Sequence, residues 1–253
     1  MNFTQILERI NTRQYGMIAM LLTFLFAVNT LYRAWTYKNK AVETITVVGG
    51  AEKTFESDLI QWSGSYSKSN VVLRDAHTAL KQDEANIRAY LKSKGIADSE
   101  IIFNSVNIDK LFNRSYGENG QLTSETFAGY NLTQSVTVES KDINKVEKLS
   151  REITDLLQTG IEFNSSSPSY FYTKLKDLKI ALLASASEDA YTRAKTVAQS
   201  SHSSLGDLKK AVVGVFQITG QNSDEAYTYG GAFNTTDRHK KASITIRQDY
   251  SIN

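Results

Sequence analysis

Histidine and carboxylate side chains are the residues of this sequence that could act as general acids, general bases or metal ligands. The chain has three histidines, His77, His202 and His239, and no cysteine. His77 falls in a helical pattern, His202 in a serine-rich helix end and His239 in the charged run DRHKK. The patterns HExxH, CxxC and GxSxG do not occur. We therefore expect a non-enzymatic protein with no catalytic residue, no metal site and no cofactor, and we interpret the histidines as structural or solvated.

Two pairs of neighbouring residues contain carboxylates that could take part in catalysis or bind a cation. Asp189 and Arg193 are four residues apart in a helical pattern, so we expect a structural ion pair across one turn rather than a catalytic pair. Asp224 and Glu225, in SDEAY, could bind a cation weakly, but a solvated loop explains them better. Neither pair predicts a reaction.

Two long polar connections contain the aromatic residues that could contact a partner. They read NRSYGENGQL and QNSDEAYTYGGAFNTTDRH. Loops of this length are uncommon in compact domains unless they are functional or disordered. Three interpretations stay open, namely contact with a neighbouring subunit, binding of a glycan or small ligand, and a mobile solvent loop. The candidate interaction residues are Tyr116, Tyr227, Tyr229 and Phe233.

Three amphipathic helices are predicted from apolar residues that recur at helical spacing. The first spans about 70–94, with Ser69 or Asn70 as its N-cap and Gly95 as its stop. The second spans about 143–157 and ends at Gly160. The third, rich in alanine, spans about 175–201. Its expected buried face is Leu175, Leu178, Leu182, Ala186, Ala190 and Val197.

Strand patterns flank these helices in adjacent pairs. We expect strands in TITVVGG, DLIQWSGSY, EIIFNSVNIDKLF, GYNLTQSVTVES, IEFNSSSPSYFY, KKAVVGVFQIT and ASITIRQDYSI. The third and fourth would form a hairpin with a long polar loop over 113–128, and Pro168 places IEFNSSSPSYFY at a sheet edge or bulge. A turn or bulge explains the pair Gly49 and Gly50. The order predicts an α+β fold with largely antiparallel sheets and about three packed amphipathic helices.

The stretch GMIAMLLTFLFAVNTLYRAW predicts a membrane helix before this domain. No charged side chain occurs from 14 to 32, and these residues as a helix would span roughly 28 Å, close to the hydrocarbon thickness of a bilayer. We expect a single-pass anchor rather than a long signal peptide, because no A-x-A-like cleavage site follows. Tyr32, Trp35 and Tyr37 suit the lipid–water interface. Positive charges on both sides leave the orientation open.

The charge balance separates the N-terminal segment from the remainder. Residues 1–40 contain five Lys or Arg and one Glu, so removing their +4 from the total of +2 leaves −2 for residues 41–253. The basic character therefore belongs to the tail and anchor, and no nucleic-acid surface is expected. We expect two parts, a tail with the anchor over 1–40 and one domain over 41–253.

Several local patterns, taken in order, resemble the SIMPL-domain family (DUF541) of bacterial envelope proteins. The most specific is ALLASASEDAYTRAKTVAQSSHSSLGDLKKAVVG, which is similar to the family's alanine-rich helix, Gly-containing loop and strand. ITVVGGAEKTFESDL is similar to its opening strand and turn, with Asp58 at the acidic position. The segments LKSKGIADSEIIFNSVNI and GYNLTQSVTVE resemble later elements. One departure is Ser57, where the family commonly has proline.

The resemblance implies a domain outside the cytoplasmic membrane, with links to envelope stress, a tendency to self-associate and no established enzymatic mechanism. On this basis we expect a cytoplasmic tail, a single-pass anchor in the inner membrane and a periplasmic domain that forms homo-oligomers. Its expected role is a self-assembling or interaction module in envelope maintenance or stress tolerance. The alternative is a periplasmic module that binds a small ligand or a glycan.

Overall fold

The computed structural model describes residues 12–39 and 43–252, so the expected tail over 1–11 lies outside the described residues. The described chain forms two compact units. The first holds residues 12–39, 43–46, 194–210 and 249–252, and the second holds 47–193 and 211–248. All of the candidate site residues belong to the second unit.

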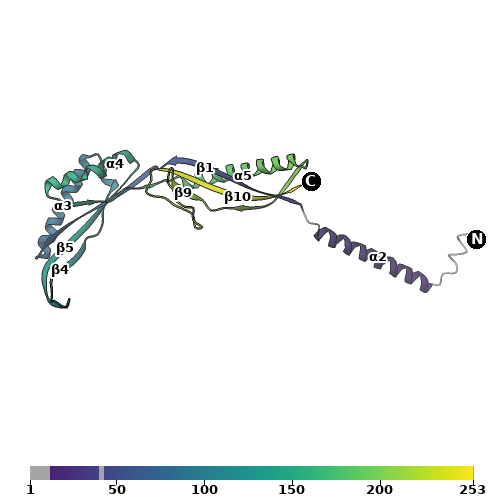
Figure 1. The fold of residues 1–253 in the computed structure, drawn as a ribbon, viewed down its shortest axis with the longest axis horizontal. Coiled ribbons are helices and arrows are strands. Elements are labelled where there is room, and N and C mark those ends of the chain that lie inside the picture. The colour runs from purple at the N-terminus through teal and green to yellow at the C-terminus, as the bar shows by residue number, and fades with distance from the viewer. Residues whose placement is uncertain (1–11, 40–42, 253) are drawn as a thin grey trace, which may run out of the picture. The chain divides into compact units, whose positions relative to one another are not determined.

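The elements confirm an α+β fold with antiparallel sheets, preceded by an apolar helix (Figure 1). The helices are α2 (Thr12–Asn39), α3 (Leu73–Ser93), α4 (Ile143–Glu152) and α5 (Leu175–Ser200), with short 3-10 helices η1 (Asp98–Glu100) and η2 (Ile153–Thr159). The strands are β1 (Thr44–Glu56), β2 (Leu59–Asn70), β3 (Ile101–Phe103), β4 (Asn107–Tyr116), β5 (Leu122–Ser140), β6 (Phe163–Ser165), β7 (Ser169–Phe171), β8 (Leu205–Val213), β9 (Gln217–Gly220) and β10 (His239–Ile252).

The larger sheet is built around a long antiparallel pair, β2 with β5. The strand order is β3-β5-β2-β6, with β4 also on β5 and β7 also on β2. Helices α3 and α4 lie against this sheet (Figure 1). Period-two alternation along the strands and helical periodicity in α3 and α4 direct the apolar side chains into one core. Its fully buried members include Ile60, Trp62, Tyr66, Leu80, Ile87, Leu91, Leu132, Val136, Val138 and Val146.

Gln134, which interrupts the apolar face of β5, points into this core and is 4% exposed. Its side-chain oxygen accepts a hydrogen bond from the Tyr66 hydroxyl at 2.8 Å, and its amide donates to the Asn104 carbonyl at 2.9 Å. A buried amide with both groups bonded avoids the free-energy penalty of an unpaired polar group. Gln134 is therefore a polar member of the core, on the same buried face of β5 as Leu132 and Val136.

The smaller sheet has the order β1-β10-β8, with β9 also on β10. Helix α5 turns small and apolar residues inward at intervals of four, namely Leu178, Leu182, Ala186, Ala190, Ala194 and Ala198. The expected inclusion of Val197 in this face is wrong, because Val197 is 47% exposed. The interval of four continues through Ala194 and Ala198, and Val197 lies one residue off that stripe.

Two expected connections differ from the structure. The segment 113–128 was expected to be a long loop, yet β4 and β5 continue through most of it and leave a turn over 117–121. Sequence periodicity missed this extension because β4 is exposed along its whole length and has no buried face. The single strand expected in KKAVVGVFQIT is divided into β8 and β9. A Cβ on Gly214, between them, would lie 2.8 Å from Thr245 Oγ1.

The helix ends at Gly95 and Gly160 agree with the sequence signals, whereas the start of α3 does not. Gly95 and Gly160 have left-handed φ angles of +84° and +80°, as expected for glycine stops. The expected N-cap at Ser69 or Asn70 is wrong, because β2 continues to Asn70 and the cap is Val72. Asn70 still contributes, since its Oδ1 accepts the Val72 N–H at 2.9 Å.

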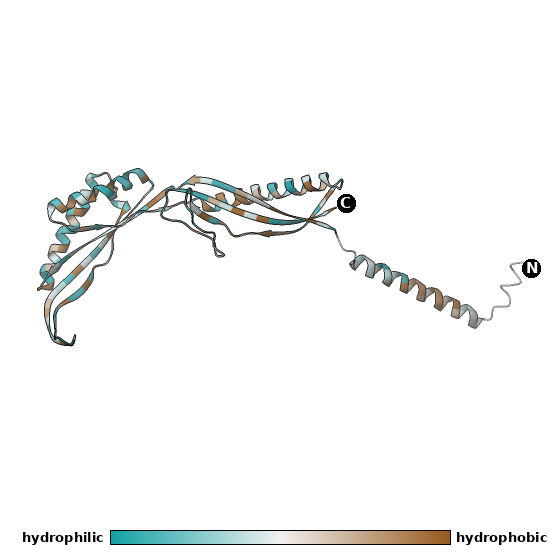
Figure 2. Cartoon of the chain, in the orientation of Figure 1, coloured by the Kyte–Doolittle hydropathy of each residue, from teal (hydrophilic) through white to brown (hydrophobic). Residues whose placement is uncertain are grey.

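The apolar helix α2 contains a stretch of 23 residues, Tyr15–Tyr37, that is long and apolar enough to cross a membrane. None of its most apolar window is buried against the rest of the described chain. Figure 2 shows the hydrophobic colour concentrated along this helix, whereas the strands alternate. It has the length and composition of a membrane anchor or a signal sequence.

Candidate functional site

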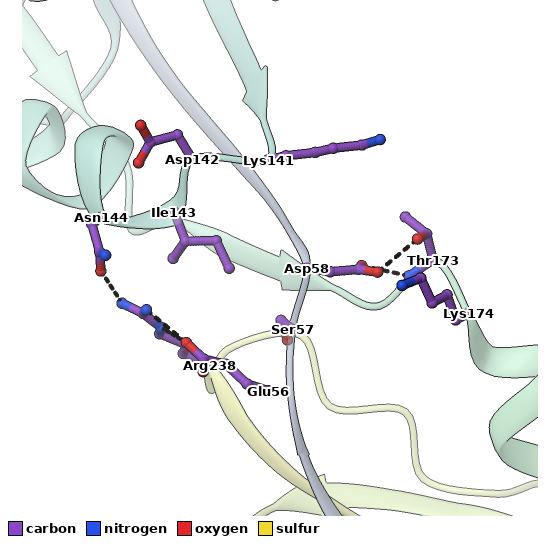
Figure 3. Close-up of a pocket in the computed structure, with 10 residues that line it drawn as sticks. All are labelled: Glu56, Ser57, Asp58, Lys141, Asp142, Ile143, Asn144, Thr173, Lys174 and Arg238. Atoms are coloured by element: carbon purple, nitrogen blue, oxygen red, sulfur yellow. Dashed lines mark hydrogen bonds and ion pairs between the residues drawn. The ribbon is translucent and has the colours of Figure 1, made fainter.

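A cleft of about 560 Å³ lies in the second unit where four chain connections meet (Figure 3). We call it the central cleft. Its walls are residues 56–58 between β1 and β2, 141–144 at the start of α4, 173–174 before α5, and Arg238 before β10. Sequence analysis did not find it, because no local pattern links four segments so far apart in the chain.

Arg238 joins three of these connections. Its Nε donates to Glu56 Oε1 at 2.6 Å, and its Nη1 donates to Asn144 Oδ1 at 2.7 Å and to Glu147 Oε2 at 3.3 Å. The bond to Glu56 is the main reason that the pKa of Arg238 is raised. Arg238 therefore links β1, α4 and the start of β10 through charge-assisted hydrogen bonds.

The β1–β2 connection consists of Ser57 and Asp58. Asp58 accepts hydrogen bonds from the backbone N–H and the hydroxyl of Thr173, both at 2.7 Å, so it holds the segment before α5. The Ser57 N–H donates to the Arg238 carbonyl at 3.0 Å, a bond that a proline at this position could not make. Ser57 is 4% exposed, and its Oγ has no hydrogen-bond partner in the described chain.

The start of α4 forms the opposite wall. Asp142 is the N-cap, and its Oδ1 accepts the Lys145 N–H at 3.1 Å. This backbone hydrogen bond is the main cause of the lowered pKa of Asp142. Lys141 and Lys174 also line the cleft, and neither side-chain ammonium has a hydrogen bond or ion pair to another described residue. Two cations are thus available at the walls.

Asp189 and Arg193 on α5 form the ion pair, with Arg193 Nε 2.8 Å from Asp189 Oδ2. Asp189 also accepts the Gly50 N–H at 2.9 Å, and this bond is the main reason that its pKa is lowered. Gly49 and Gly50 lie inside β1, so a turn is the wrong explanation for them. The close approach of α5 requires Gly49 instead, because an added Cβ would lie 2.3 Å from the Ala186 carbonyl oxygen.

The opening strand, the acidic turn and the alanine-rich helix thus meet as one structural arrangement. The SIMPL family profile, described as a protein of unknown function (DUF541), matches residues 45–249. The chain belongs to the SIMPL family. A search of curated proteins finds no match. The family match covers β1 through most of β10, and the apolar helix α2 precedes it.

The aromatic candidates lie on two different elements of the SIMPL domain. Tyr116 ends β4 and is 61% exposed, while Tyr227, Tyr229 and Phe233 lie in the connection between β9 and β10. Tyr229 is fully exposed. Tyr227 and Tyr229 line a groove of about 240 Å³ together with residues of β9 and β10. The structure therefore brings two of the four residues to one site.

Hydrogen bonds of buried polar side chains hold the connection between β9 and β10 in place. Gln217 Oε1 accepts the Ala232 N–H at 2.7 Å, and its amide donates to the Thr228 carbonyl at 2.9 Å. The Lys240 ammonium is buried and donates to the Asn234 carbonyl at 2.6 Å. Burial is the main cause of the lowered pKa of Lys240. The charged run DRHKK is therefore not solvated throughout, because Lys240 is buried.

The histidines of the SIMPL domain lie apart from these sites. His77 is exposed on α3, His239 is exposed at the start of β10, and His202 occupies a left-handed turn after α5 with φ 55°. Over residues 12–39 and 43–252, no group of three His, Cys, Asp or Glu side chains is placed to hold a metal ion. Catalytic inactivity stays an expectation.

Proposed function

We propose that this SIMPL-domain protein is a membrane-anchored, non-enzymatic module that self-associates in the bacterial envelope and serves envelope maintenance or stress tolerance. The observation that supports it best is the β4–β5 hairpin, here called the hairpin arm (residues 107–127). Every residue of β4 is exposed. Exposed apolar side chains gather on the arm, namely Ile108, Leu111, Phe112, Leu122 and Phe127, with exposures from 38% to 52%.

Aromatic rings give the hairpin arm a defined surface. The Phe112 and Phe127 centroids are 6.0 Å apart, and the Phe127 and Tyr130 centroids are 5.1 Å apart, both in edge-to-face geometry. Exposed apolar clusters of this kind mark interaction sites on soluble domains. Among the described strands β4 pairs only with β5, so its outer edge offers backbone donors and acceptors to another strand.

The occupant that we propose is a second copy of this chain. Anchoring through residues 14–32 would confine copies to the plane of the inner membrane and raise their effective concentration. Weak contacts between hairpin arms would then suffice for assembly. The domain would face the periplasm, as in the envelope proteins that the family resemblance implies.

The anchor is tested by membrane extraction. We expect the full chain to stay in the membrane fraction after an alkaline carbonate wash, because a helix of this length buries its apolar side chains in lipid. A variant lacking residues 1–40 should be released by the same wash. Protease added to spheroplasts should digest the domain if it faces outward. Release of the full chain would overturn the anchor, and protection from protease would overturn the orientation.

Assembly is tested by light scattering of the full chain in detergent over a range of protein concentrations. Substituting Phe112→Ser and Phe127→Ser together should weaken self-association by about tenfold or more, as for aromatic anchors of other interfaces. The matched control is Tyr229→Ser, which removes an exposed ring from the other aromatic segment. Point substitution is preferable to truncation of 221–238, which would remove the Asn234 contact to Lys240.

The outcomes of this experiment separate the two expected functions. Equal self-association of the double variant and the parent would overturn the role of the hairpin arm. Loss in Tyr229→Ser alone would move the interface to the β9–β10 connection. A monomer at every concentration would contradict assembly and favour a module that binds a ligand or glycan, with the groove at Tyr227 and Tyr229 as its site.

A further inference from the structure

In the central cleft the carboxylates have hydrogen-bond or ion-pair partners within the chain, whereas two of the cations do not. The cleft is lined by three carboxylates and three cations. Glu56 is paired with Arg238 at 2.6 Å, Asp58 accepts two hydrogen bonds from Thr173, and Asp142 accepts from Lys145. Lys141 and Lys174 have no such partner in the described chain. The charges of the lining residues balance, and the two cations without a partner are the groups available to a ligand.

Two further features favour an anion over a cation. The cleft includes the first residues of α4, where the helix dipole and unbonded N–H groups favour negative charge. Ser57 lines the same cleft, and its buried Oγ lacks a partner in the described chain. A buried hydroxyl without a hydrogen bond is unfavourable, so an acceptor that reached it from the cleft would relieve that penalty. These observations come from separate segments of the chain.

We propose that the central cleft binds a small oxyanion, a phosphate or carboxylate group carried by a soluble molecule, with Lys141 and Lys174 as its cations. A lysine ammonium is a mobile point charge with three donors, so the two side chains can converge on oxygen atoms without a fixed fork geometry. Asp58 and Asp142 keep the hydrogen bonds that they accept within the chain. Their negative charges limit the affinity of the cleft for an anion to a modest value. The hairpin arm lies on other elements, so this binding is independent of self-association.

The test is titration of the full chain in detergent with sodium phosphate, followed by calorimetry and by thermal unfolding at constant ionic strength. A ligand that binds only the folded state raises the melting temperature with its concentration. We expect a saturating rise with phosphate, and a parallel titration with sodium acetate shows whether a carboxylate suffices. In Lys141→Met combined with Lys174→Met, the phosphate Kd should rise by about tenfold or more.

The matched control is Lys53→Met, which removes one exposed lysine of β1 away from the cleft and should bind phosphate as the parent does. Lys141 and Lys174 are exposed, so their variants are expected to fold, which circular dichroism verifies. Ser57→Ala should weaken binding while leaving the fold intact. The proposal is overturned if sodium chloride at equal ionic strength gives the same rise, or if the double variant binds as tightly as Lys53→Met.

Discussion

Replacing Gly49 with alanine is expected to lower the free energy of unfolding by about 3 kcal/mol, as for overpacked core sites at the upper end of their range. The added Cβ would lie 2.3 Å from the Ala186 carbonyl oxygen and 2.5 Å from the Ala190 amide nitrogen. Both are backbone atoms of α5, so no side chain can rotate away and the helix must move off β1. Urea unfolding of the full chain in detergent measures the change.

Gly50 provides the matched control for this substitution. A Cβ there meets its nearest atom, the Ile244 carbonyl oxygen, at 3.8 Å, which is an ordinary contact. Gly50→Ala also keeps the N–H that donates to Asp189. Its stability should stay within about 1 kcal/mol of the parent, the usual size of a glycine-to-alanine effect. Equal stability of Gly49→Ala and Gly50→Ala would contradict the close approach of α5 to β1.

Replacing Trp62 with alanine is expected to destabilise the domain by about 3–5 kcal/mol, as for other buried aromatic residues. Trp62 is fully buried, its Nε1 donates to Ser165 Oγ at 3.0 Å, and its ring stacks on Phe163 at 5.7 Å. Truncation would leave a cavity between β2 and β6. Chemical unfolding monitored by circular dichroism reports the loss.

Trp35 is the natural control, because it is the only other tryptophan of the chain. It lies on α2 and is 65% exposed. Trp35→Ala should leave the unfolding of the domain unchanged, since no core contact is removed. If Trp62→Ala lowers the free energy of unfolding by less than about 1 kcal/mol, the larger sheet can collapse around the cavity.

Local periodicity accounts for much of what the sequence predicted. The apolar stripes of α3 and α4 and the alternation in β2 and β5 are set by residue spacing within single elements, so they are visible in short windows. The extension of the hairpin arm beyond Phe112 was missed for the same reason, because exposed strands such as β4 have no buried face to leave a pattern. Pro168 was interpreted correctly, since the short strands β6 and β7 on either side of it both pair with β2.

The central cleft was beyond sequence reasoning for a different reason. Arg238, Ser57, Lys141 and Lys174 come from four connections and carry no shared motif. Lys240 looked like part of a solvated run, and only its contact with Asn234 identifies it as an interior residue. Gly49 was visible as an unusual residue, but the distance to α5 was needed to explain it.

The pairing of β1 with β10 has a consequence for the order in which the protein is made. These strands are the first and the last of the domain, and the hydrogen bond from Thr46 to Asp249 joins residues 203 positions apart. A chain that emerges from its N-terminus presents β1 long before its neighbour exists. The smaller sheet is therefore closed only after synthesis, and any transport, has delivered the final strand, and a chain interrupted before residue 239 keeps an unfilled place beside β1.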